Sequence, residues 1–188
     1  MARVATQGDK QNDFTKGAGM DYLKEVLRLI HIVGGMYWFG AVMMMYFFVT
    51  PSVMATGEAG QQFMKYLGGS SGLSKSILWA AMLSAFAGAW LYWIDSSGFQ
   101  SDWMKSSAGT MFTLGGFFGA VALTFGLIVN RAIAALGKLG AQIQGKPTPE
   151  QMAQMQALQK RNGMAMKYAT YALIVSAVCM ALARFFVM

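Results

Sequence analysis

Four long apolar runs constrain this chain more than any other feature of its sequence. They cover residues 26–49, 77–94, 110–129 and 164–187. At about 1.5 Å per residue, a helix of about 20 apolar residues crosses the ~30 Å hydrocarbon core of a bilayer. Lipid offers no hydrogen-bond partner to an open backbone, so each run is predicted to be helical. The predicted fold class is all-α, an integral membrane four-transmembrane-helix bundle formed by residues 22–188.

The composition agrees with a chain whose main solvent is lipid. Hydrophobic residues make up 55% of the 188 residues and charged residues only 12%, about half the charged share of soluble domains. The single cysteine, Cys179, excludes an internal disulfide framework. The net charge of +7 is expected to face anionic lipid rather than nucleic acid. Residues 1–20 are polar, unlike a signal peptide, so the first run is predicted to be a retained span.

Residues 131–161, between the third and fourth runs, are predicted to form an extramembrane helical hairpin. Apolar residues recur there at helical spacing on both sides of a break at residues 145–149. Thr148 is placed as a helix N-cap, Pro149 lies in the first turn, and Gln151 completes a capping box. The hairpin would offer a docking surface to a neighbouring subunit or contact lipid headgroups.

Residues 1–21 form a polar, glycine-bearing tail, a composition that stays mobile on its own. A partner subunit is the natural agent to order it. With four spans, the tail, the second loop and the C-terminus share one side of the membrane. The distribution of lysine and arginine favours the cytoplasm for the opposite, hairpin side.

Small residues recur at four-residue spacing within the runs and predict close helix packing. They let two backbones approach, and the resulting van der Waals contact drives helix association in lipid. The predicted packing positions are Gly34, Gly35, Gly40, Ala85, Gly88, Gly115, Gly119 and Gly126.

His31 is the only histidine and lies inside the first run. An ionisable side chain is costly at that depth, so His31 is the candidate cofactor-binding residue. Three interpretations stay open: a ligand to haem or a metal, a proton-relay or quinone contact, and a neutral histidine hydrogen-bonded to a neighbouring helix. Haem held by two histidines of one chain is excluded because there is no second histidine.

The sequence carries no constellation of catalytic residues. It shows no nucleophile–base pair, no phosphate-binding glycine loop and no Cys/His spacing typical of zinc. We therefore expect no enzyme activity, no catalytic or metal-ligating residues and no resident cofactor beyond a contact at His31.

The stretch from Leu29 to Gly40, with its histidine, paired glycines and Trp-x-Gly, and the following Pro51 resemble the first helix of the copper-resistance protein D-like (CopD-like) membrane family. The run from Phe125 to Arg131, the Pro-Thr-Pro-Glu-Gln hairpin and the segment 180–184 are similar to uncharacterised four-span members. The family name implies copper handling, yet no methionine–histidine cluster lies at chelating spacing. The chain also resembles accessory subunits of bacterial energy-transducing complexes, such as the quinol-oxidising alternative complex III of phototrophic bacteria.

These observations predict a non-catalytic accessory subunit of a bacterial multi-subunit membrane complex, with electron transport as its setting. It would lie in the plasma membrane, with lipids and other membrane subunits as partners. One alternative is a membrane protein that contacts haem, copper or quinone through His31. A second is a small transporter, which would need a polar path across the bilayer.

Overall fold

The computed structural model describes residues 7–70, 72–143 and 145–186, and this part of the chain contains helices and no strand. The elements are α1 (Gln7–Met44), the π-helix η1 (Met45–Val49), α2 (Thr50–Ala55), α3 (Glu58–Lys65), the π-helix η2 (Tyr66–Ser70), α4 (Leu73–Asp95), the 3₁₀-helix η3 (Asp102–Lys105), α5 (Ser107–Gln142), α6 (Pro149–Ala183) and the 3₁₀-helix η4 (Arg184–Phe186).

Four helices are long and apolar enough to cross a membrane: Gly19–Ala55, Leu73–Asp95, Ser107–Gln142 and Pro149–Phe186. Each overlaps one of the four apolar runs of the sequence, the fourth as far as Phe186. The structure therefore confirms the predicted all-α bundle of four spans, and the chain is a multi-pass membrane protein.

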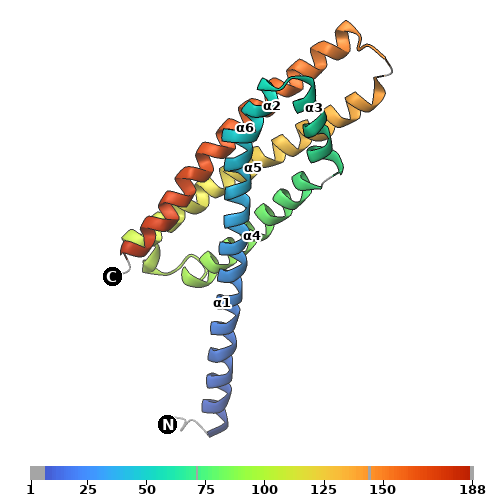
Figure 1. Cartoon of the computed structure of the whole chain (residues 1–188). Helices are drawn as coiled ribbons and strands as arrows, with labels where there is room; N and C mark the ends of the chain where they lie inside the picture. The colour runs from blue at the N-terminus through green and yellow to red at the C-terminus, as the bar shows by residue number, and fades with distance from the viewer. Residues whose placement is uncertain (1–6, 71, 144, 187–188) are drawn as a thin grey trace.

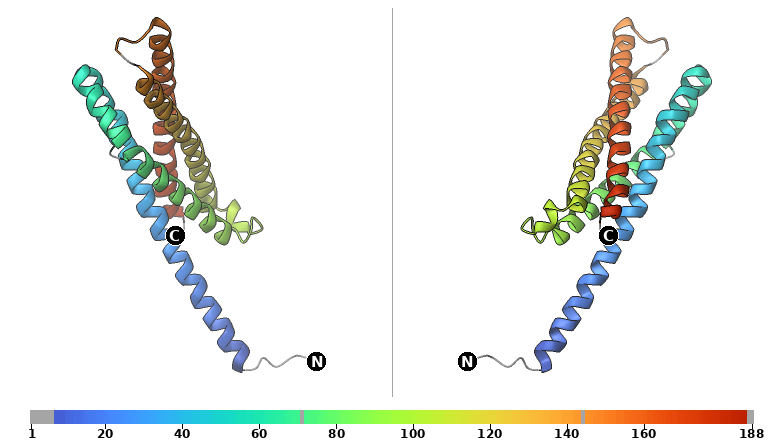
Figure 2. Two further views of the ribbon diagram at one scale, coloured as in Figure 1. Left: turned by 90° about the vertical axis from the view of Figure 1, so that its right-hand side faces the viewer. Right: turned by 90° about the vertical axis from the view of Figure 1, so that its left-hand side faces the viewer.

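The bundle is built from two helix pairs (Figure 1). α5 packs along α6, α1 packs on α4, and the contact between α4 and α5 joins the pairs. The core where they meet is made of Trp38, Val42, Ala81, Ala122, Ala172 and Leu173. Several of these are alanines, which allow the helix axes to approach closely. Toward the hairpin end, α1 and α6 diverge (Figure 2).

The predicted hairpin is present. α5 continues past the third run to Gln142, and α6 begins at Pro149. The Thr148 hydroxyl accepts a bond from the Gln151 N–H at 3.3 Å, and the Gln151 side chain accepts one from the Thr148 N–H at 2.9 Å. This reciprocal capping box satisfies backbone donors that have no partner within the helix.

Glu150 lies in the first turn of α6. Its own backbone N–H and then the Thr148 hydroxyl lower the pKa of its carboxyl group. Because the folded-state pKa is lowered, the carboxylate stabilises this helix end above the ordinary pKa of a glutamate. That contribution is lost as the pH falls through the lowered pKa.

The first helix does not end at Thr50-Pro51, where the first run stops. The Thr50 N–H donates to the Met45 carbonyl, five residues back, so the chain makes a π turn before the proline. A proline has no N–H, and its ring clashes with the carbonyl four residues back in an α-helix. The wider turn shifts the backbone hydrogen-bond pattern just before the proline. The Ser52 hydroxyl then donates to the Phe48 carbonyl at 2.7 Å. The helix then continues to Ala55.

The polar tail predicted over residues 1–21 joins the first helix. From Gln7 onward it forms the first turns of α1, which project beyond the bundle (Figure 1), and residues 1–6 lie outside the described residues. Extending an existing helix adds one hydrogen bond for each residue fixed, without a new nucleation cost. The apolar part of α1 therefore serves as the nucleus for its polar extension.

Residues 96–106 and the C-terminal end lie at one end of the bundle, and α3 and the hairpin lie at the other (Figure 1). In a Cys179→Ser background, we expect Gln100→Cys and Lys146→Cys, both at exposed positions, to react with a membrane-impermeant maleimide from opposite sides. One should be labelled in intact cells and the other only after permeabilisation. Labelling of both in intact cells would contradict the four-span arrangement.

Candidate functional site

His31 is held between α1 and α4 by hydrogen bonds that run in both directions. Its Nδ1 lies 2.8 Å from the Ser84 carbonyl oxygen. A carbonyl oxygen only accepts, so Nδ1 carries a proton, and in the neutral form of the ring Nε2 keeps its lone pair. The Ser84 hydroxyl donates to the His31 carbonyl oxygen at 2.9 Å. Each residue thus binds the backbone of the other, and together they fasten α1 to α4.

The His31 ring occupies a notch created by a glycine. A Cβ atom at Gly88 would lie 2.6 Å from His31 Cε1 and 2.7 Å from Nδ1. A Cβ at Gly34 would lie 3.3 Å from the Ala80 carbonyl oxygen, and one at Gly35 would lie 3.2 Å from Ser84 Oγ. Close contact between α1 and α4 therefore depends on these three predicted packing positions.

Further contacts extend the α1–α4 interface in antiparallel register. Near one end, Lys24 Nζ lies 3.2 Å from Asp95 Oδ1. Toward the other end, the Tyr37 hydroxyl lies 2.9 Å from Ser76 Oγ. A polar contact therefore recurs along the pair, on both sides of His31.

The α5–α6 pair uses a second close contact. The Ser176 hydroxyl donates to the Gly115 carbonyl oxygen at 2.7 Å. A Cβ at Gly115 would lie 3.0 Å from the Met180 side chain, and one at Gly119 would lie 3.4 Å from Ser176 Oγ. Ser176 was not predicted from the sequence, although a serine within an apolar run is a signal for an interhelical hydrogen bond.

The remaining predicted packing positions are less enclosed. A Cβ at Gly40 or Gly126 would meet no atom within 4 Å. Ala85 is half-buried, whereas Ala81 and Ala87 on the same helix are buried. Gly40 and Gly126 therefore face open space in this chain rather than another of its helices.

No group of three or more His, Cys, Asp or Glu side chains within the described ranges could hold a metal ion. His31 Nε2 has no hydrogen-bond partner within the same ranges. It can offer one lone pair to a ligand or accept one hydrogen bond.

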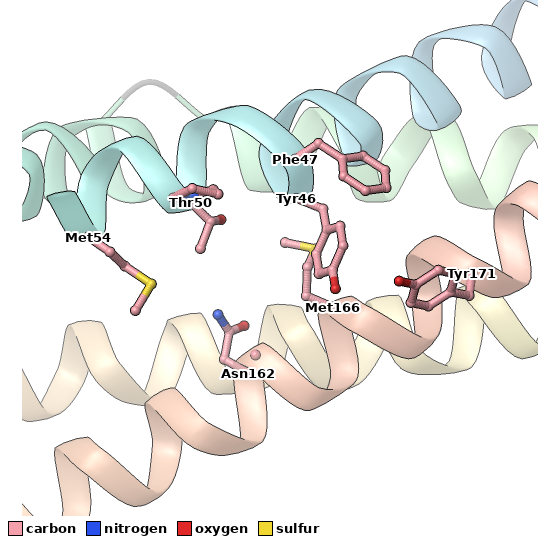
Figure 3. A pocket seen from close by; sticks show the side chains of 9 residues that line it. Tyr46, Phe47, Thr50, Met54, Asn162, Met166 and Tyr171 are labelled. Carbon is pink, nitrogen blue, oxygen red and sulfur yellow. The ribbon is translucent and has the colours of Figure 1, made fainter.

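A separate cleft of about 470 Å³ lies where α1 and α6 diverge (Figure 3). It is lined by Tyr46, Phe47, Thr50, Pro51 and Met54 from the first span and by Asn162, Gly163, Met166 and Tyr171 from α6. This cleft was not predicted from the sequence, because its walls come from residues more than a hundred positions apart.

No family model, curated protein or solved structure matches this chain. The resemblance to the copper-resistance protein D-like family therefore stays a prediction.

A matched pair of substitutions tests the close contact between Gly88 and the His31 ring. We expect Gly88→Ala to displace the His31 ring and lower the free energy of unfolding by about 1–3 kcal/mol, the usual cost of overpacking. Gly40→Ala, the same change in open space, should leave it unchanged or slightly raised. Thermal unfolding in detergent measures both effects.

A second substitution separates steric overlap from a general loss of helix stability. Removing the ring in Gly88→Ala/His31→Ala should make the alanine at position 88 less costly than it is beside histidine. Equal costs in the two backgrounds would show that His31 does not fill the notch.

Proposed function

We propose that this chain is a non-catalytic accessory subunit of a bacterial multi-subunit membrane complex. One observation carries the proposal: the spans cover little of one another. Within the most apolar stretch of each span, the buried share of residues is 11% in the first, 17% in the second and third, and 28% in the fourth. The uncovered surface has to meet either lipid or the helices of another subunit.

Features of that uncovered surface favour a protein partner. Gly40 and Gly126 lie within the first and third spans with open space above them. In lipid, glycines let a second helix approach closely and gain van der Waals contact. The hairpin and the projecting part of α1 extend beyond the spans and would add contacts outside the hydrocarbon core.

We further propose that this complex takes part in electron transport. The resemblance of the chain to accessory subunits of bacterial energy-transducing complexes supports this proposal. Under this proposal, the protein lies in the bacterial plasma membrane, and the hairpin faces the cytoplasm.

Extraction in a mild detergent, followed by affinity purification and native electrophoresis, tests the proposal. We expect the chain to migrate in a larger assembly with a defined set of co-purifying subunits. Migration only as a free monomer would contradict the proposal.

A graded pair of variants then tests the glycine face. Gly126→Ala should keep the assembly, whereas Gly126→Leu should lose it without lowering the chain's own unfolding temperature, because the leucine enters open space. An intact assembly in Gly126→Leu would place the interface elsewhere on the chain.

A second candidate function is contact with haem or quinone through His31. It is favoured by the orientation of the ring, since the Nδ1 bond to the Ser84 carbonyl leaves the Nε2 lone pair without a partner in the described chain. Ligating histidines are commonly oriented in this way by a backbone carbonyl.

Visible spectra and metal analysis of the purified assembly test this second candidate. We expect a haem band that is lost in His31→Ala and retained in Cys179→Ser, or quinone that co-purifies with the wild type alone. A colourless, metal-free and quinone-free assembly that His31→Ala leaves unchanged would exclude it.

A further inference from the structure

The cleft between the first span and α6 lies at a defined depth relative to the membrane. Thr50-Pro51 closes the first apolar run, and Gly163 directly precedes the fourth. Both walls therefore pass from apolar to polar sequence at the cleft, on the hairpin side. This level corresponds to the boundary between the hydrocarbon core and the lipid headgroups.

The polar side chains that line this cleft are free to bind a ligand. The Tyr46 and Tyr171 hydroxyls, the Thr50 hydroxyl and the Asn162 amide have no hydrogen-bond partner in the part of the chain that the structure describes. Figure 3 shows the two tyrosine hydroxyls turned toward each other and Asn162 reaching across the cleft toward the first span. Four polar groups from two helices thus converge on one space.

Several similar side chains elsewhere in the spans are paired. Thr113, Thr124 and Thr170 each donate to the carbonyl four residues back, at 2.8–2.9 Å. The Tyr92 hydroxyl lies 2.7 Å from Thr113 Oγ1. Thr50 directly follows the π turn η1 and makes no such bond. Single π turns inside α-helices occur frequently at functional sites.

Asn162 is costly where it lies. Its Oδ1 is buried and has no hydrogen-bond partner. An unsatisfied buried polar atom costs about 1–3 kcal/mol, a cost that an apolar side chain of similar size avoids. A residue that lowers the stability of the fold is expected at a functional site, where its chemistry is needed. The Nδ2 group of the Asn162 amide is available to a ligand in the cleft.

No lysine, arginine, aspartate or glutamate lines the cleft, while three aromatic rings do. Its volume, about 470 Å³, lies within the range of small-molecule sites. A charged headgroup would find no counter-ion there, whereas a neutral head with oxygen atoms would find donors and acceptors on both walls. An attached apolar chain would leave between α1 and α6, where the helices diverge.

We propose that this cleft binds an uncharged membrane amphiphile whose head carries hydrogen-bonding oxygen atoms and whose tail extends into the lipid. Two kinds of membrane component share this chemistry: a diacylglycerol, and a ring-headed quinone or its reduced form. The proposal is independent of the accessory role and of His31, which contacts α4 rather than this cleft.

The test measures ligand-induced shifts in the unfolding temperature of the purified full chain in detergent. The probes are dioleoylglycerol, decylubiquinone and, as a charged control, dioleoylphosphatidylglycerol. We expect at least one neutral probe to raise the unfolding temperature in a saturable manner. A shift with one neutral probe identifies the source, and a shift with both supports the shared chemistry. No shift with either, or an equal shift with the anionic lipid, overturns the proposal.

Variants separate binding from packing. Asn162→Leu should raise the unfolding temperature without ligand and weaken the apparent affinity about fivefold or more, the equivalent of one lost hydrogen bond. A structural role alone would lower the unfolding temperature instead. Tyr171→Phe, which keeps the ring, should also weaken binding and serves where Asn162→Leu folds poorly.

The matched control is Asn130→Leu. Asn130 lies at the hairpin end of the third run, and its Nδ2 already donates to the Gly126 carbonyl at 3.4 Å. This variant should bind the probe as the wild type does. Undiminished binding by both Asn162→Leu and Tyr171→Phe would overturn the assignment of the site.

Discussion

The structure depends on one constraint: within lipid, the backbone has to satisfy its own hydrogen bonds. Its effect is clearest at Pro51, where an α-helix would lose a bond and meet a steric clash. The chain responds with a π turn from Met45 to Val49 and a serine hydroxyl bonded to a carbonyl. The helix therefore passes through the proline. The cost of this detour is a distorted wall, and that wall forms one side of the cleft.

The two helix pairs are held together in different ways. In lipid, apolar side chains gain little by leaving one apolar medium for another, so packing and hydrogen bonds decide which helices associate. α1 and α4 are joined by polar contacts at Lys24, His31 and Tyr37, with glycines between them. α5 and α6 rely mainly on length of contact, with one buried bond from Ser176 to Gly115. The link between the pairs is smaller, which leaves room for them to separate at one end.

Much of the fold could be predicted from the sequence because it is encoded locally. Apolar run length located the four spans, and the capping box at Thr148 located the start of α6. The end of the first helix could not be predicted, since a proline normally stops a helix and the π turn has no simple sequence signature.

The candidate sites depend on contacts between distant residues and were harder to predict. His31 was identified, and so was Gly88 as a packing position. The part that Gly88 plays in enclosing the histidine could be seen only from the register of α1 against α4. Asn162 was missed because a polar residue just outside an apolar run is ordinarily solvated. Its burial arises only in the assembled bundle, which no local pattern in the sequence describes.

The continuous helix from Gln7 to Ala55 has a mechanical consequence. Contacts with α4 fasten it along a stretch from Lys24 to Tyr37 rather than at one point. At about 1.5 Å per residue, that anchored stretch is about 20 Å long and the free tip from Lys24 to Gln7 about 26 Å. The anchored stretch resists tilting, so a sideways push on the projecting tip bends the tip and leaves the cleft wall at Thr50 in place.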